Sequence, residues 1–275
     1  MGEGWGEGRS FNLLDRNIFA VTLPIITDPL FYAVAIPAVI LVGIAKGGFP
    51  GAFGGMAVPL MSLAISPITA VGIMLPILCL MDLVGLWAYR GIWDRTRMKT
   101  MIIGAALGVT MGGLLFGHLN EQAIRFLVGS IAVGFALNHW LGFTARGKPG
   151  AETRAKGVFW CGLSGFTSTV AHAGGPPLMV YMLPLKMEKT LLVGTTVIFF
   201  TAVNYFKLIP YAILGQLNLA NMSTSLALSP FAPLGMGLGV WLHKRVNEKV
   251  FYRISYTILF LMGAKLIYDG VSHWH

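Results

Sequence analysis

Long stretches without a charged residue constrain this chain more than any other feature of its sequence. A helix that crosses a bilayer needs about 20 consecutive, mostly apolar residues, because the hydrocarbon core is about 30 Å thick. Overall, 55% of the residues are hydrophobic, 11% are charged and the mean hydropathy is +0.71. These values predict an all-α polytopic membrane protein. The stretches that lack Asp, Glu, Lys and Arg include Pro29–Ala45, Gly51–Met81, Thr100–Gly117, Thr190–Phe206 and Leu208–Leu242.

The formal net charge of +9 comes largely from basic residues in short loops between the apolar stretches. Loops of this kind stay on the cytoplasmic side of a membrane, so they indicate orientation rather than a nucleic-acid partner. The three loops richest in positive charge hold Arg90, Arg95, Arg97 and Lys99, then Arg146, Lys148, Arg154 and Lys156, then Lys244, Arg245 and Lys249.

An internal repeat divides the chain. Leu107-Gly108, Gly112 and Asn120-Glu121 recur as Leu234-Gly235, Gly239 and Asn247-Glu248, at a constant offset of 127 residues. Upstream, Gly54-Gly55 with Pro59-Leu60 is echoed by Gly174-Gly175 with Pro177-Leu178. We therefore predict two homologous halves. The expected organisation is an N-terminal tail with an interfacial helix near Asn17–Ile26 (1–27), a first transmembrane repeat (28–145), a cytoplasmic linker (146–156), a second transmembrane repeat (157–270) and a C-terminal tail (271–275).

Each half begins with an apolar stretch that glycine and proline interrupt. The first interruption is Lys46-Gly47-Gly48-Phe49-Pro50-Gly51 and the second is His172-Ala173-Gly174-Gly175-Pro176-Pro177. Helix breakers at membrane depth free backbone groups, which protein or a water-filled cavity must satisfy. Two such breaks at corresponding positions are typical of a transporter's binding site. A kinked but otherwise ordinary helix is the alternative.

Counting the crossings decides between two topologies. If both broken segments crossed the bilayer fully, the second and third basic loops would lie on opposite sides. If each segment is instead a re-entrant hairpin, each half has three spanning helices, and the odd number inverts the second half. All three basic loops then face the cytoplasm. We therefore expect two inverted repeats, each with a broken or re-entrant helix followed by three spanning helices; eight full crossings are the alternative.

Glycines at four-residue spacing indicate where helices pack closely. Gly104, Gly108 and Gly112 follow one another in the first half, and Gly235 with Gly239 repeats the spacing in the second. Small residues let helices approach each other in lipid. We expect these glycines to lie at helix contacts, with a gating hinge as the alternative.

The two breaks are predicted to bind an anion. A helix that begins near the membrane centre presents unpaired N–H groups and the positive end of its dipole. Glycine also leaves room for a ligand to reach the backbone. The predicted substrate-binding residues at the breaks are Lys46, Gly47, Gly48, Phe49, Gly51, Gly54, Gly55, His172, Gly174 and Gly175.

Charged residues inside the spans need a reason, since a Lys or Asp near the bilayer centre costs about 2.5–3.5 kcal/mol on insertion scales. Lys46 adjoins the first break, and Lys207 closes the span that corresponds to the one carrying Asp82. Both lysines are predicted to complement the charge of an anion, together with Asn204, which takes the place of Asp82 in the second half. Asp82 is expected to pair with a lysine or to exchange a proton. Snorkelling lysines and a purely structural Asp82 are the alternatives.

Other polar residues in the spans are weaker candidates. His172 could bond an oxyanion or shuttle a proton, or be a satisfied core histidine. Thr195 and Thr196 could donate hydroxyls to a substrate, as could Ser168, although such hydroxyls commonly bond a carbonyl of their own helix. Neither Cys residue has the spacing of a metal site, and we predict no metal, no cofactor and no disulfide.

Several short motifs, taken in order along the chain, resemble those of one family of membrane transporters. They are Gly43-Ile44-Ala45-Lys46-Gly47-Gly48-Phe49, Gly54-Gly55 with Pro59-Leu60, His172-Ala173-Gly174-Gly175-Pro176-Pro177, and the stretch Asn204–Gln216 with Lys207, Pro210-Tyr211 and Gly215-Gln216. On these residues the chain resembles the sulfite exporter TauE/SafE family over about 34–270. The resemblance implies export of sulfite or of small sulfonated or carboxylated anions through the cytoplasmic (inner) membrane of a bacterium. The family is often richer in glycine at the first break, so Phe49 is a candidate gate here.

An anion channel and an intramembrane enzyme are the alternatives to a transporter. An anion channel would need a continuous polar lining, whereas the spans here are apolar except near the breaks. An intramembrane enzyme would need a nucleophile with a base, or metal ligands spaced as in HExxH, and no such spacing occurs. We therefore expect a secondary transporter rather than an enzyme, with a small inorganic or organosulfur anion and the lipid bilayer as its partners. The sequence leaves open the anion, the coupling ion and whether the protein forms a homodimer.

Overall fold

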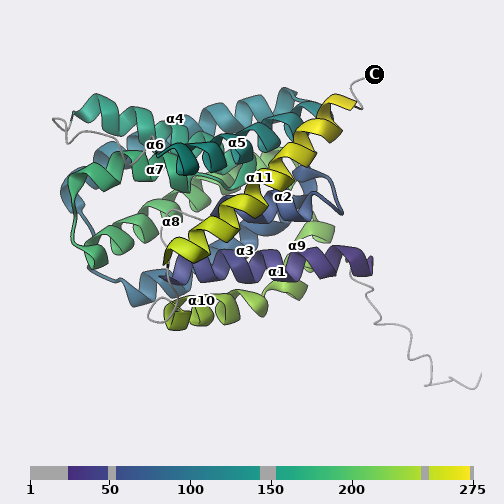
Figure 1. The fold of residues 1–275 in the computed structure, drawn as a ribbon, viewed down its shortest axis with the longest axis horizontal. Helices are drawn as coiled ribbons and strands as arrows, with labels where there is room; N and C mark the ends of the chain where they lie inside the picture. The colour runs from purple at the N-terminus through teal and green to yellow at the C-terminus, as the bar shows by residue number, and fades with distance from the viewer. Residues whose placement is uncertain (1–23, 49–53, 143–152, 243–247, 273–275) are drawn as a thin grey trace, which may run out of the picture.

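The computed structural model describes residues 24–48, 54–142, 153–242 and 248–272, and within these ranges all regular structure is helical. The all-α prediction is therefore confirmed (Figure 1). Most of the predicted interfacial helix near Asn17–Ile26 lies outside the described residues, as do Phe49 and Gly51. The helices are α1 (Pro29–Gly48), η1 (Gly54–Met56), α2 (Ala57–Met61), α3 (Pro67–Ala88), α4 (Arg95–His118), α5 (Glu121–Leu141), α6 (Arg154–Ala171), α7 (Gly175–Met182), η2 (Leu183–Leu185), α8 (Lys189–Ile213), α9 (Leu219–Leu228), α10 (Phe231–Leu242) and α11 (Glu248–Ser272).

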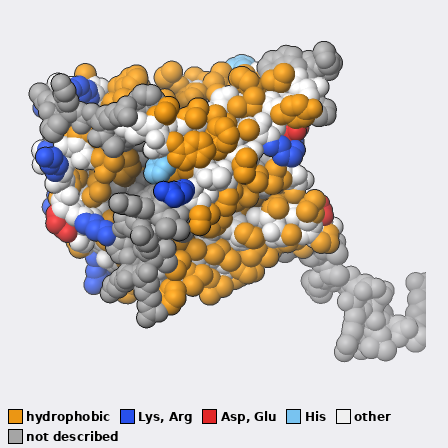
Figure 2. Space-filling view, in the orientation of Figure 1, with side chains coloured by type: hydrophobic (Ala, Val, Ile, Leu, Met, Phe, Trp, Pro, Cys, Tyr) orange, Lys and Arg blue, Asp and Glu red, His pale blue; other side chains and the backbone are white. Residues whose placement is uncertain are grey.

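Within the described ranges, five helices are long and apolar enough to cross a membrane: α1, α3, α4, α5 and α8. Large apolar side chains point outward from them, as at Trp87 and Ile213, where 73% and 80% of the surface is exposed. Figure 2 shows apolar side chains across most of the visible face. Such a surface suits lipid rather than water.

Polar residues between the apolar stretches set where the long helices begin. The Asp94 carboxylate accepts hydrogen bonds from the N–H groups of Thr96 and Arg97 and so caps α4. Burial opposes ionisation of Asp94, but the hydrogen bonds from Arg97 outweigh it and hold the pKa of this carboxyl below its usual value. Side chains of Asn120 and Glu188 cap α5 and α8 in the same way. These caps satisfy N–H groups that have no partner within the helix.

The second of the three crossings expected in the second half is not one continuous helix. Helix α9 ends at Leu228 and α10 begins at Phe231, with Ser229 and Pro230 in a turn between them. Proline has no N–H to donate to a carbonyl of the preceding turn, so the helical hydrogen bonds are interrupted at Pro230. The turn divides an apolar stretch that the sequence analysis did not divide.

Three helix pairs make the most extensive contacts: α1 with α10, α4 with α6, and α5 with α11. Glycines lie where two of these pairs touch. A Cβ atom on Gly104 would lie 2.5 Å from the carbonyl oxygen of Val158 on α6, and one on Gly235 would lie 2.6 Å from that of Ile40 on α1. Gly108 likewise packs directly on Gly162. The predicted role of these glycines in close helix packing is confirmed.

The order of the contacts gives the direction of each helix relative to its partner. Gly104 touches Val158 and Gly112 touches Thr169, so α4 and α6 run parallel. In the same way α1 and α10 run parallel, because Gly235 lies against Ile40 and Gly239 against Ile44. Helices α5 and α11 run antiparallel, with Gly129 against Gly263 and Gly270 against Phe126.

One end of the helix bundle is basic. The start of α4 lies beside the start of α8, since the N–H of Asp94 donates to Thr195 Oγ1 at 3.0 Å, and beside the start of α6, where Gly157 packs on Thr100. Figure 2 shows the Lys and Arg side chains of the visible face concentrated toward its left end. The exposed basic residues that flank these helix ends are Arg90, Arg95, Lys99, Arg154, Lys156 and Lys189.

Replacing Gly235 by Ala is expected to destabilise the fold by about 1–3 kcal/mol, because the new methyl group overpacks the contact between α1 and α10. Gly237 lies on the same helix with nothing within 4 Å of a Cβ atom, so Gly237→Ala is the matched control. Thermal unfolding of the purified protein in detergent should show a lower midpoint for Gly235→Ala and an unchanged or higher one for the control. Equal midpoints would contradict the described packing.

Candidate functional site

Specific contacts fix the conformation of the second glycine-rich segment, which is the break at His172-Ala173-Gly174-Gly175-Pro176-Pro177. Helix α6 ends at Ala171, and His172 adopts a left-handed backbone conformation with φ of 52°. Few residues other than glycine adopt this conformation, and it stops the helix. The hydroxyl of Ser164 then donates to the carbonyl of Gly174 at 2.6 Å, and α7 begins at Gly175. The chain therefore changes direction here without leaving the Gly174 carbonyl unpaired.

The two glycine-rich segments touch each other inside the protein. A Cβ atom on Gly55 would lie 2.7 Å from Cβ of Ala173, so only glycine allows this approach. Gly174 is equally confined, because a Cβ atom there would lie 2.6 Å from the carbonyl oxygen of Ser164. The structure therefore brings together Gly55, Ala173 and Gly174, which are far apart in the sequence.

Asp82 lies beside these segments and joins three helices. Its carboxylate is 2% exposed. One oxygen pairs with the ammonium of Lys46 from α1, and the other accepts a hydrogen bond of 2.6 Å from the side-chain amide of Asn204 on α8. Lys46 also donates to the carbonyl of Leu78 at 3.4 Å. Both oxygens of Asp82 thus have a donor, which offsets the unfavourable burial of the charge.

Lys207 is fully buried and is held by neutral groups. Its ammonium donates to the carbonyl and the hydroxyl of Ser168, each at 3.2 Å, and lies 2.8 Å from Nδ1 of His172. The other ring nitrogen of His172 lies 3.0 Å from the carbonyl oxygen of Val71. A carbonyl only accepts and an ammonium only donates, so Nε2 of His172 carries the proton and Nδ1 accepts. His172 is therefore a neutral partner of Lys207.

The charges of the cluster do not cancel. Among the described residues, Asp82 is the one acidic residue that the fold buries, whereas Lys207 is buried and the Lys46 side chain is 20% exposed. With all three ionised, the cluster carries one excess positive charge. A buried charge of this kind is unfavourable unless something compensates it. The arrangement is suited to hold one small anion.

The other predicted site residues lie in several places. The hydroxyls of Thr195 and Thr196 donate to carbonyls of their own helix, those of Leu191 and Leu192, at 2.7 and 2.8 Å. Gly47 packs against α10 at Met236. Gly48 ends α1 and Gly54 begins η1. Helix α2 has only five residues, so its dipole is small.

Two contributions to the site were not found from the sequence. One is Ser164, whose hydroxyl donates to the carbonyl of Gly174 in the second break. The other is the pair of carbonyls of Leu78 and Val71, which accept hydrogen bonds from Lys46 and His172. A serine in an apolar segment is common, and backbone acceptors have no sequence signal.

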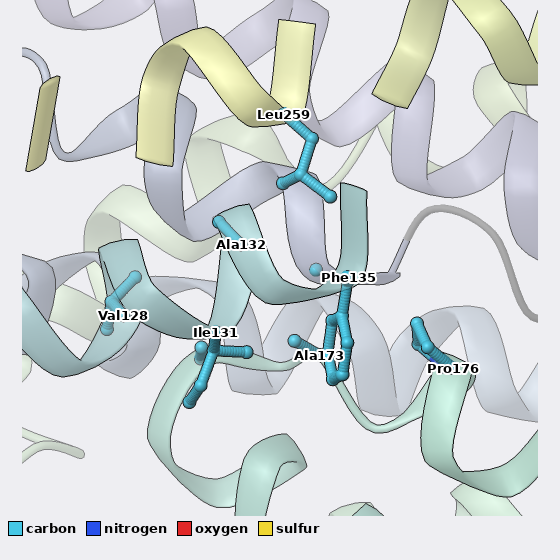
Figure 3. A pocket seen from close by; sticks show the side chains of 9 residues that line it. Val128, Ile131, Ala132, Phe135, Ala173, Pro176 and Leu259 are labelled. Atoms are coloured by element: carbon cyan, nitrogen blue, oxygen red, sulfur yellow. The ribbon is translucent and has the colours of Figure 1, made fainter. Parts of the chain in front are cut away.

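A narrow apolar pocket lies on the other side of the touching segments. Gly55, Ala173 and Pro176 line it together with side chains from α5 and α11. Figure 3 shows Val128, Ile131, Ala132, Phe135 and Leu259 around it. Since no lining residue is charged, this pocket does not suit an anion. Within the described ranges, no group of three or more His, Cys, Asp or Glu could hold a metal ion.

Replacing Ser164 by Ala should destabilise the protein by about 1 kcal/mol, because the hydroxyl that fixes the break is lost from a fully buried position. Thr110→Ala is the control, since that exposed hydroxyl bonds only a carbonyl of its own helix, Ala106. Thermal unfolding in detergent measures both. An effect no larger than that of the control would show that Ser164 does not hold the break.

The family model described as sulfite exporter TauE/SafE matches residues 35–266, which is most of the chain. No curated protein and no solved structure matches.

Proposed function

The chain belongs to the sulfite exporter TauE/SafE family, and from that premise we propose that it is a secondary transporter that exports a small anion. The proposed substrates are sulfite and small organosulfonates or carboxylates, and the proposed location is the bacterial cytoplasmic membrane. The family is one of transporters, and the apolar helices are those of a multi-pass membrane protein. The observation that carries the proposal is the excess positive charge buried at the junction of the two glycine-rich segments.

The substrate site is proposed to lie between Lys46, Asn204 and Lys207. Lys46 and Lys207 supply positive charge, and the amide of Asn204 supplies a neutral donor. His172 and Ser168 position Lys207 from α6. A desolvated cation interacts with an anion far more strongly than one in water does, because the surroundings screen it less.

The halves are proposed to be inverted repeats. Helix α4 runs away from the basic end, whereas its counterpart in the second half, α10, lies parallel to α1 and runs toward that end. Likewise α3 ends near the start of α4, while α8 begins there. The pairing of α4 with α6 and of α10 with α1 exchanges the halves, as a twofold relation between them requires.

The two broken segments are proposed to be re-entrant hairpins. Helix α6 starts at the basic end, and α7 returns toward it, since Tyr181 lies against Gly157 near the start of α6. The first hairpin, α1 with α2, returns to the opposite end, where Arg125 at the start of α5 donates to the carbonyl of Ser62. The contact between Gly55 and Ala173 would then be the meeting point of the two tips.

The membrane potential favours export of an anion. A potential of about 100 mV, negative inside, is worth about 2.3 kcal/mol for each charge, so a dianion gains about 4–5 kcal/mol on leaving. This corresponds to about three decades of concentration ratio. The membrane potential alone can therefore drive export of a dianion.

Proteoliposomes that contain the purified protein should accumulate radiolabelled sulfite in a saturable manner. Lys46→Gln is expected to raise the KM several-fold, because the substrate loses a cationic partner. Lys99→Gln is the control, since Lys99 is exposed at the start of α4. Absence of transport for sulfite, organosulfonates and carboxylates alike would refute the proposed function, and flux that does not saturate would favour a channel.

The topology predicts which loops an impermeant thiol reagent reaches in intact cells. In a background without Cys79 and Cys161, a Leu219→Cys variant should be labelled from outside, because 61% of Leu219 is exposed at the end opposite the basic residues. A Lys99→Cys variant should be labelled only after the membrane is opened. The reverse result would overturn the proposed orientation.

A further inference from the structure

The hydrogen bonds around Asp82 resemble those that an oxyanion would make. The ammonium of Lys46 binds one carboxylate oxygen, and the amide of Asn204 binds the other at 2.6 Å. Carboxylates, sulfite and sulfonates all carry at least two oxygens on one central atom, so two of these oxygens can face the donors that the Asp82 carboxylate faces. Lys46 and Asn204 can therefore bind an oxyanion with the same two donors that now bind the Asp82 carboxylate.

We propose that Asp82 is an internal mimic of the transported oxyanion, which takes the place of its carboxylate between Lys46 and Asn204. This inference rests on the proposed function. Without substrate, Asp82 occupies the two donors and keeps Lys46 neutralised. The substrate displaces the carboxylate, and the return of Asp82 to the same donors releases the substrate. Asp82 is thus a competitor built into the site.

Lys46 is placed so that such an exchange can occur. Among the described residues, its three N–H groups have two acceptors, Asp82 and the carbonyl of Leu78. Its side chain is 20% exposed, whereas that of Asp82 is 2% exposed. A substrate can therefore approach the ammonium from its exposed side before the carboxylate leaves.

Lys207 offers the displaced carboxylate a second partner. It lies three residues after Asn204 on α8, on the same face of the helix, and it interacts electrostatically with Asp82. Its present contacts are all to neutral groups of Ser168 and His172. With Asp82 turned toward Lys207 and a monoanion on Lys46, the charges of the cluster would cancel. Binding of a monoanion thus compensates the excess positive charge that the cluster carries without substrate.

The test is a double-mutant cycle on the full-length protein. Asp82→Asn keeps the shape of the side chain and removes its charge, and it is expected to tighten equilibrium binding of radiolabelled sulfite about tenfold. In a Lys46→Gln background the same change should have much less effect, because no ammonium is released. Asp82→Ser is the second variant if Asp82→Asn does not fold. The affinity for bromide, which is a single atom, should rise less in Asp82→Asn than the affinity for sulfite.

Transport kinetics supply an independent measurement. In proteoliposomes, Asp82→Asn should lower both KM and kcat, because the variant cannot expel the bound anion. A KM that is unchanged or higher would overturn the proposal and leave Asp82 as a structural ion-pair partner. An equal gain in affinity with and without Lys46 would also overturn it, since Asp82 would then act only as a repulsive charge. A wild-type protein that binds no small anion would refute the proposed function as well.

Discussion

The Asp82 carboxylate holds together the centre of this protein. It joins α3, which carries it, to α1 through Lys46 and to α8 through Asn204. A charge inside the bilayer is tolerated only with partners, so these helices must place their polar groups within reach of one another. Lys207 extends the same polar centre to α6 through Ser168 and His172. Four helices from both halves thus meet at one small group of side chains.

Helix packing around this centre depends on small residues rather than on polar contacts. Gly104 and Gly108 let α4 lie against α6, and Gly235 lets α10 lie against α1. In lipid there is little hydrophobic drive for two helices to associate, so close van der Waals contact must supply the stability. The polar centre therefore positions the charged side chains, whereas the glycine contacts join helices of opposite halves.

Sequence reasoning predicted the helical class and the residues of the polar centre, because charge inside an apolar segment is conspicuous. The sequence singles out Lys46, Asp82, Asn204, Lys207 and His172, and the structure brings them together. Sequence reasoning did not find the turn between α9 and α10, and it left open whether the Thr195 hydroxyl bonds a substrate or, as the structure has it, its own helix. In a membrane protein both the lipid face and the interior are apolar, so hydrophobic periodicity does not tell which way such a side chain points.

The contact between Gly55 and Ala173 has an electrical consequence under the proposed hairpin arrangement. Where two re-entrant tips meet, any water that enters from the two sides is separated by a layer much thinner than the bilayer. The transmembrane voltage then falls over a short distance around the tips rather than evenly across the membrane. An anion held beside them would feel most of the driving force during a small displacement, and a slight separation of two backbone segments would suffice to let it pass.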